Sequence, residues 1–270
     1  MTDEIARYNI ARWRALAEAD ALFTRVRLEQ TPETARQNLD PDGWFGDVTG
    51  KRVLCLASGG GHQSAGFALL GAEVTVFDLS PEQLLRDRAA AAHYGLHVEA
   101  VEGDMRDLSV LPAASFDYVY HPYALNFVPD ARVVFREVAR VLRPGGHYFL
   151  SCANPFLFGL SERDWNGAGY ALRHPYVDGA QLTNADSDWV YDRDKHAPVP
   201  GSREYRHTLS TLVQGLRACG FVLADLSDNT SIHPDPQAAP GTWNHFVAIA
   251  PPWLAFWSVL RPDVFNSTGG

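Results

Sequence analysis

The sequence predicts an α/β protein built on a doubly wound, mostly parallel β-sheet. Between residues 52 and 154, short apolar runs typical of buried strands alternate with the residue spacing of helices. The chain has 270 residues, 46% of them hydrophobic and 20% charged, so it can bury a sizeable core. No internal repeat or low-complexity tract interrupts the alternation. We therefore expect one domain over residues 1–270, with segments appended to the sheet.

The first 50 residues predict a helical N-terminal cap. Residues at helical spacing lie roughly on one face, namely Ile5, Tyr8, Trp13, Leu16 and Ala17. A turn-rich stretch follows around Pro41, Asp42 and Gly43. The cap is expected to end where the first strand begins.

Residues 51–154 predict the sheet core and its connecting helices. Strands are expected at 53–56, 74–77, 98–101, 116–120 and 147–152. The first strand leads into three glycines, and a helix through Phe67 stops at Gly71. Ser80, Pro81 and Gln83 mark the start of the next helix, because a hydroxyl can cap it and proline suits its first position. That helix ends near residue 95, and another spans about 131–142.

The alternation of strand and helix patterns ends after residue 154. Residues 155–207 mix acids and glycines with seven aromatic residues before Asp192, and we interpret them as an inserted lid over the site. These aromatic residues are Phe156, Phe158, Trp165, Tyr170, Tyr176, Trp189 and Tyr191. Residues 208–270 predict a last helix, which ends at Gly220, and two strands at 221–226 and 253–260. Because no helix is expected between these strands, they should pair antiparallel.

Composition limits the function classes. With 23 Lys and Arg against 32 Asp and Glu, the net charge is −9, which argues against nucleic acid and favours a small-molecule partner. Cys55, Cys152 and Cys219 lie far apart in apolar runs, so we expect buried thiols rather than disulfides. The N-terminus does not resemble a signal peptide, and prolines interrupt the apolar run 246–260. We expect a cytoplasmic protein without a membrane partner.

Three features at the ends of the first three strands indicate a ligand site. The run VLCLASGGGHQ joins a strand to a helix through glycines, where backbone can approach a ligand and a helix N-terminus offers free N–H groups. Asp78 ends the second strand and can accept hydrogen bonds from both hydroxyls of a ribose. Gly103, Asp104 and Met105 follow the third strand and place a carboxylate beside the same crevice, where an adenine amino group is a natural partner.

A fourth feature is the segment FDYVYHPYALNFVPD, which leads through a helix to RVLRPGG. Together, the four features resemble the class I S-adenosylmethionine-dependent methyltransferases in order and spacing over about residues 50–155. The likeness extends to LVQGLRACGF near the last helix. The resemblance implies a Rossmann-like, seven-stranded sheet with an antiparallel last strand, S-adenosylmethionine as cofactor, and methyl transfer as the activity.

The resemblance also implies roles for individual residues. The backbone of the glycine turn would pass under the methionine moiety, Asp78 would bind the ribose, Asp104 and Met105 would bracket adenine, and His121 would lie beside the sulfonium. The expected cofactor-binding residues are Ala57, Gly59, Gly61, Asp78, Leu79, Gln83, Asp104, Met105 and His121. Cys55 and Ala57 depart from the commonest family pattern, which has an acid and a glycine there, so the partner of the methionine ammonium stays open.

Methyl transfer is a displacement at an activated carbon, so alignment and exclusion of water supply most of the rate. A base is needed only if the acceptor must lose a proton. The candidate catalytic residues are His121 and Tyr123 just past the fourth strand, His207 before the last helix, and His245 between the last strands. The histidines have no tight metal-ligand spacing, so we expect no metal.

The acceptor is expected to be a small molecule, an amine or an electron-rich aromatic such as an indole or a phenol. Whether nitrogen, oxygen or carbon is methylated stays open, as does the oligomeric state. Two alternatives remain. A nicotinamide-dependent oxidoreductase would also use a glycine turn and a strand-end acid, although Ser64 stands in place of the third glycine of its motif. A non-catalytic module could bind S-adenosylmethionine without turnover.

Overall fold

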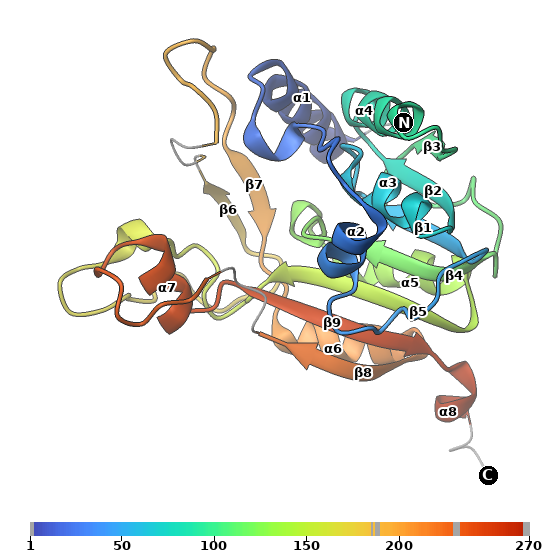
Figure 1. Cartoon of the computed structure of the whole chain (residues 1–270). Coiled ribbons are helices and arrows are strands. Elements are labelled where there is room, and N and C mark those ends of the chain that lie inside the picture. The colour runs from blue at the N-terminus through green and yellow to red at the C-terminus, as the bar shows by residue number, and fades with distance from the viewer. Residues whose placement is uncertain (1–2, 185, 187–189, 229–232, 267–270) are drawn as a thin grey trace.

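The computed structural model describes residues 3–184, 186, 190–228 and 233–266 (Figure 1). Its centre is a seven-stranded sheet of order β3-β2-β1-β4-β5-β9-β8. The strands are β1 (Arg52–Leu56), β2 (Glu73–Asp78), β3 (Glu99–Glu102), β4 (Phe116–His121), β5 (Leu142–Ala153), β8 (Phe221–Ser227) and β9 (Trp253–Leu260). The first five pair in parallel, and β9 runs antiparallel to both β5 and β8. The predicted fold class is confirmed, including the antiparallel last strand.

Helices cover both faces of the sheet. On one face lie α2 (Pro32–Leu39), α3 (His62–Leu69) and α4 (Pro81–His93), and on the other lie α5 (Ala131–Val141) and α6 (Leu209–Ala218). Strand β1 shows why its sequence is apolar after Arg52: Leu54 and Leu56 pack on the α5 side, while Val53 and Cys55 pack on the α3 side. A continuous apolar run is therefore the signature of a strand covered on both faces.

Local signals place the helix starts. Ser80 Oγ accepts a hydrogen bond from the backbone N–H of Gln83 at 3.3 Å, and Pro81 is the first residue of α4, as the sequence predicts. Asp130 caps α5 through the N–H of Arg132, and Thr208 caps α6. These caps fix where each connection returns to the sheet.

The N-terminal helix α1 (Glu4–Glu18) forms where predicted, but its buried stripe differs from the expected face. The buried residues are Ala6, Asn9, Arg12 and Leu16. The polar members are buried because they find partners: the Asn9 amide donates to the carbonyl of Phe127 at 3.2 Å, and Arg12 forms an ion pair with Asp186 at 2.7 Å. Apolar periodicity alone cannot reveal a stripe that contains paired polar groups.

The segments outside the core hold elements that the sequence pattern missed. Residues 155–207 contain a short 3₁₀ helix, η3 (Glu162–Asp164), and a two-stranded hairpin of β6 (Gln181–Asn184) and β7 (Ser202–Tyr205). The helix ending before Gly220 is not the last, because α7 (Trp243–Ile249) and α8 (Pro262–Asn266) follow. Residue Trp189 lies outside the described residues.

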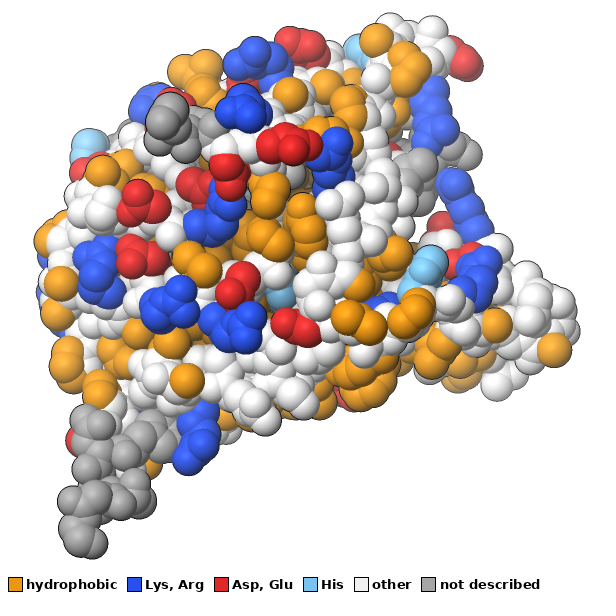
Figure 2. All heavy atoms as spheres, turned by 180° about the vertical axis from the view of Figure 1, so that it is seen from behind, with side chains coloured by type: hydrophobic (Ala, Val, Ile, Leu, Met, Phe, Trp, Pro, Cys, Tyr) orange, Lys and Arg blue, Asp and Glu red, His pale blue; other side chains and the backbone are white. Residues whose placement is uncertain are grey.

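The surface carries both signs of charge. On the face seen in Figure 2, acidic and basic side chains are interspersed rather than gathered in one basic stripe. Within the described ranges, no helix is both long and apolar enough to span a membrane.

Candidate active site

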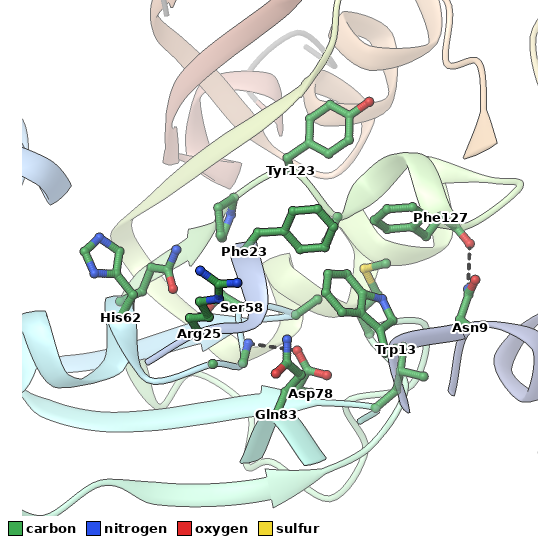
Figure 3. Close-up of a pocket in the computed structure, with 18 of the residues that line it drawn as sticks. Asn9, Trp13, Phe23, Arg25, Ser58, His62, Asp78, Gln83, Tyr123 and Phe127 are labelled. Atoms are coloured by element: carbon green, nitrogen blue, oxygen red, sulfur yellow. Dashed lines mark hydrogen bonds between the residues drawn. The ribbon is translucent and has the colours of Figure 1, made fainter. Parts of the chain in front are cut away.

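A cavity of about 270 Å³ opens at the carboxyl ends of β1, β2 and β4 (Figure 3). One side is formed by the turn after β1 and by residues at the end of β2, and the other by α1, the 3₁₀ helices η1 (Leu22–Thr24) and η2 (Leu125–Phe127), and the loop after η1. The lining residues are Asn9, Trp13, Leu22, Phe23, Arg25, Arg27, Ala57, Ser58, Gly59, Gly60, His62, Gln63, Asp78, Leu79, Gln83, Met105, Pro122, Tyr123, Ala124 and Phe127. Ligands of doubly wound sheets bind at this edge.

The turn after β1 approaches the cavity through its backbone. Ala57 has a φ of +48°, in the left-handed region that favours glycine. A Cβ added to Gly59 would lie 2.7 Å from Gln83 Cβ, so no larger residue fits without displacing α4. Gly61 faces elsewhere: a Cβ there would lie 2.8 Å from Ala90 Cβ on α4. Gly61 does not line the cavity, so the expected cofactor contact is not supported. Its lack of a side chain instead allows α4 to pack closely against the turn.

Three N–H groups of the glycine turn already donate to side chains of the protein. Gly59 N donates to Asp78 Oδ2 at 2.8 Å, and the next two N–H groups, of Gly60 and Gly61, donate to the carboxylate of Asp87 on α4. A buried N–H must find a partner, and here two carboxylates supply it. A ligand at the turn would therefore face the side of these peptide groups that lies opposite the N–H groups.

Asp78 is buried at the end of β2 but lines the cavity. Its Oδ1 accepts from Ser80 N at 2.9 Å, so each carboxylate oxygen already holds one backbone hydrogen bond and can accept another. Burial raises the pKa of Asp78, and these backbone bonds oppose the rise. Leu79, Gln83 and Met105 line the cavity close to it in the fold, as expected from the sequence.

Asp104 is held away from the cavity. Arg106 donates to both of its carboxylate oxygens, at 3.0 Å and 2.6 Å, and the same guanidinium reaches Asp3 at the start of α1. Asp104 does not line the cavity, so its expected contact with adenine is not supported by this geometry. The reason is the strong pairing of this carboxylate with the guanidinium of Arg106.

His121 is fully buried, although it ends β4 at the correct edge. It shares a hydrogen bond of 2.9 Å between Nδ1 and the hydroxyl of Tyr148, and it does not line the cavity. Burial lowers the pKa of His121 to about 3. The expected roles beside the sulfonium and as proton acceptor are therefore not supported, because its side chain is directed into the core rather than toward the ligand.

The other three catalytic candidates lie in different parts of the structure. His207 is buried behind η2, where Nε2 lies 3.0 Å from the carbonyl of Leu125, and His245 lies on α7, 3.1 Å from the hydroxyl of Tyr170. Neither lines the cavity. Tyr123 does, and its hydroxyl donates to Glu204 of β7 at 2.8 Å. Of the four candidates, only Tyr123 belongs to the site.

Comparisons with known proteins identify the family. A family model described as "Methyltransferase domain" matches residues 54–150. The uncharacterized methyltransferase YbaJ of Bacillus subtilis is 35% identical over 229 residues, which cover 80% of this chain and 87% of that protein.

The chain belongs to the methyltransferase family.

Other relatives extend the comparison over shorter or more distant matches. A ubiquinone biosynthesis O-methyltransferase of Xanthomonas oryzae is 38% identical over 129 residues, which cover 47% of this chain and about half, 53%, of that protein. An S-adenosylmethionine dependent methyltransferase of Mesorhizobium loti has a TM-score of 0.61 at 24% identity, covering 86% of this chain and 100% of that one. One from Clostridium acetobutylicum has a TM-score of 0.59 at 13% identity, covering 86% and 93%. These solved structures show the same fold.

The protein is thus a methyltransferase with the class I fold. This replaces both alternatives, the nicotinamide-dependent oxidoreductase and the non-catalytic module. The cavity of the methyltransferase fits the cofactor chemically. Asp78 has acceptor capacity for hydroxyls, Leu79 and Met105 offer apolar surfaces, and Ser58 Oγ is buried in the cavity wall without a hydrogen-bond partner among the described residues.

Sequence reasoning missed much of the opposite side of the methyltransferase cavity. Arg25, Arg27 and Phe23 line it, and His62, on the side of the glycine turn, was missed as well. His62 directly follows the glycine turn, so its place at the start of α3 was a usable signal. Nothing local to η1 indicated that it folds over the sheet edge.

The expected lid, residues 155–207, supplies none of the cavity-lining residues among those that the structure describes. Instead, Val190 and Tyr191 pack against Leu16 and Ala21 next to α1. This segment therefore supports the part of the N-terminal cap that forms the cavity side.

Proposed function

We propose that this methyltransferase methylates a small, electron-rich aromatic acceptor, a phenol or an indole, bound against Trp13, Phe23, Tyr123 and Phe127. These four rings lie on the side of the cavity opposite Asp78 (Figure 3). Trp13 contacts Phe23 edge-on at 5.9 Å and Phe127 at 6.2 Å between ring centroids, and Tyr123 lies 6.3 Å from Phe127. An aromatic wall of this kind favours a planar ring packed against it. This aromatic wall is the observation that supports the proposal most strongly.

The charges around the cavity favour a neutral or anionic acceptor over a cationic amine. Arg25 and Arg27 both line it, whereas Asp78 is the only carboxylate among the described lining residues. Arg27 is close enough to His62 to help lower the pKa of that imidazole. An ammonium group on the acceptor would be repelled by these two guanidinium groups. A nucleic-acid acceptor is disfavoured by the net charge of −9.

For the cofactor, we propose that the ribose hydroxyls bind Asp78 and that adenine packs beside Leu79 and Met105. The methionine end would then lie along the turn at Ala57 and Gly59. Bound S-adenosylmethionine supplies a methyl group on a positively charged sulfur, which a nucleophilic atom can displace. The aromatic wall would align that atom and exclude water.

If the acceptor must lose a proton, we propose His62 as the group that takes it. Its Nδ1 is buried in the cavity wall and has no hydrogen-bond partner among the described residues. Burial, with Arg27 as a second cause, lowers the pKa of His62, so the ring is neutral and able to accept a proton at pH 7. Tyr123 suits this task less, because burial and the neighbouring Glu204 raise its pKa and its hydroxyl already donates to Glu204. The O-methyltransferase name of the Xanthomonas relative supports oxygen as the accepting atom.

The experiment is a screen of purified protein with S-adenosylmethionine against matched phenols, indoles and amines, read by the mass of the methylated product. Trp13→Ala and Phe127→Ala should each lower kcat/KM for the accepted aromatic compound by at least about tenfold. Phe156→Ala is the matched control, because Phe156 is 51% exposed and stacks on Tyr176 instead of lining the cavity. Methylation of amines alone, or full activity in both wall variants, would contradict the proposal.

A further inference from the structure

The glycine turn is held from behind by one buried carboxylate. Asp87, on α4, is 0% exposed. Its Oδ2 accepts from Gly60 N at 2.9 Å and its Oδ1 from Gly61 N at 3.0 Å, and the hydroxyl of Ser64 also donates to Oδ1. Gly61 is the N-cap of α3 and has no side chain to cap it. Asp87 therefore caps the first turn of α3 from a neighbouring helix.

These hydrogen bonds set the direction of two peptide groups. In a trans peptide the N–H and the preceding carbonyl point in opposite directions. Because the N–H groups of Gly60 and Gly61 point to Asp87, the carbonyls of Gly59 and Gly60 point away from it. Both glycines line the cavity. Asp87 thus orients two carbonyl acceptors toward the ligand side without touching the ligand.

Among the described residues, no Lys or Arg is paired with the carboxylate of Asp87. The titratable groups that face Asp87 are Cys55 on β1 and Asp78 on β2. The charge of Asp78 acts on Asp87, and the charge of Asp87 acts on Cys55. Burial raises the pKa of the Cys55 thiol, which stays neutral, and burial with nearby Asp78 raises the pKa of Asp87 to about 6. His62, at the start of α3, is the nearest titratable group of that helix to the turn, and its pKa is lowered. A positive group on the cavity side of the turn would compensate this buried charge.

We propose that Asp87 is a positioning residue of the cofactor site: its ionised carboxylate fixes the carbonyls of Gly59 and Gly60 as acceptors and supplies the negative charge that favours a cationic amino group on the other side of the turn. The amino group of S-adenosylmethionine has this chemistry. The inference concerns only the cofactor half of the cavity, so it does not depend on which acceptor is methylated.

The test compares Asp87→Asn with wild type in calorimetric titrations with S-adenosylhomocysteine between pH 5.5 and 7.5. Because the carboxylate is about one quarter ionised at pH 5.5 if its pKa is about 6, wild-type affinity should fall about fourfold from pH 7.5 to 5.5. Asp87→Asn should bind about ten- to a hundredfold more weakly at pH 7.5 and lose that fourfold dependence. Glu82→Gln is the matched control, an acid-to-amide change on α4 whose carboxylate pairs with Arg14.

Thermal unfolding distinguishes a positioning role of Asp87 from a purely structural role as a helix cap. The pKa of Asp87 is higher in the folded protein than in the unfolded chain, so its contribution to stability is greatest at low pH and is lost as the pH rises through about 6. Asp87→Asn should therefore keep most of its thermal stability at pH 7.5 while losing affinity. Wild-type affinity for S-adenosylhomocysteine in the variant would overturn the proposal.

A second variant keeps the test decisive if Asp87→Asn does not fold. Ser64→Ala removes a donor that stabilises the ionised form of Asp87 and retains both glycine hydrogen bonds. The pKa of Asp87 should rise, so the weakening of binding on acidification should begin at a higher pH than in wild type. An unchanged pH profile in Ser64→Ala would overturn the proposal as well.

Discussion

Replacing Asp78 by asparagine tests the assignment of the ribose site with little change in shape. The wild-type carboxylate accepts one backbone N–H on each oxygen, from Gly59 at 2.8 Å and from Ser80 at 2.9 Å. Asparagine offers only one acceptor oxygen, so its amide group would face one of these donors. The two ribose hydroxyls would also lose a charged acceptor. We therefore expect the change to affect cofactor binding directly.

The size of the effect follows from these contacts. Hydrogen bonds to a charged group contribute roughly 1.5–3 kcal/mol, which corresponds to about a ten- to hundredfold loss of affinity. Stability should change less, because two effects oppose each other. Asparagine misplaces a donor, but it also removes a carboxylate whose pKa is raised by burial and which therefore costs stability at neutral pH. We expect the thermal midpoint to shift by less than about 4 °C.

The assay is calorimetric titration of Asp78→Asn with S-adenosylhomocysteine, alongside thermal unfolding of the free protein. Asp107→Asn is the control, because Asp107 is exposed and does not line the cavity. Asp104→Asn should lose less than about threefold in affinity, since Arg106 already holds that carboxylate. A dissociation constant for Asp78→Asn within twofold of wild type would refute the ribose assignment.

Three further changes test other parts of the structure. Ala57→Gly should raise stability by about 0.5–1 kcal/mol in urea unfolding, because it relieves a φ of +48° at some cost in chain entropy; a loss of stability would contradict this. Asp186→Ala should lower stability by about 3 kcal/mol, since it leaves Arg12 buried without its carboxylate, and an unchanged urea midpoint would show that the pair contributes nothing. His121→Gln should keep turnover within about threefold, whereas His62→Gln should lower turnover by roughly 10²–10⁴ if the acceptor loses a proton. A large loss of turnover in His121→Gln with little loss in His62→Gln would instead identify His121 as the proton acceptor.

The sequence could predict the fold because each core element carries a local signal. The apolar run before the glycines, the cap at Ser80 and the spacing of α5 and α6 need only neighbouring residues to be interpreted. Asp78 could be placed at the site for the same reason, since the carboxyl ends of parallel strands meet at one edge. The roles of individual site residues were harder to predict, because a place at this edge does not fix where a side chain points.

By itself, the sequence determined the succession of core strands and helices between residues 52 and 154, the close backbone turn at Gly59 and the acid at the end of β2. Only the tertiary structure decided that His121 faces the core, that Asp87 holds the turn, and that Arg12 pairs with a residue 174 positions away. The physical reason is that hydrophobic periodicity records which positions avoid water. It does not record which distant polar group will satisfy a buried charge or N–H, because that partner is chosen when helices and strands pack together.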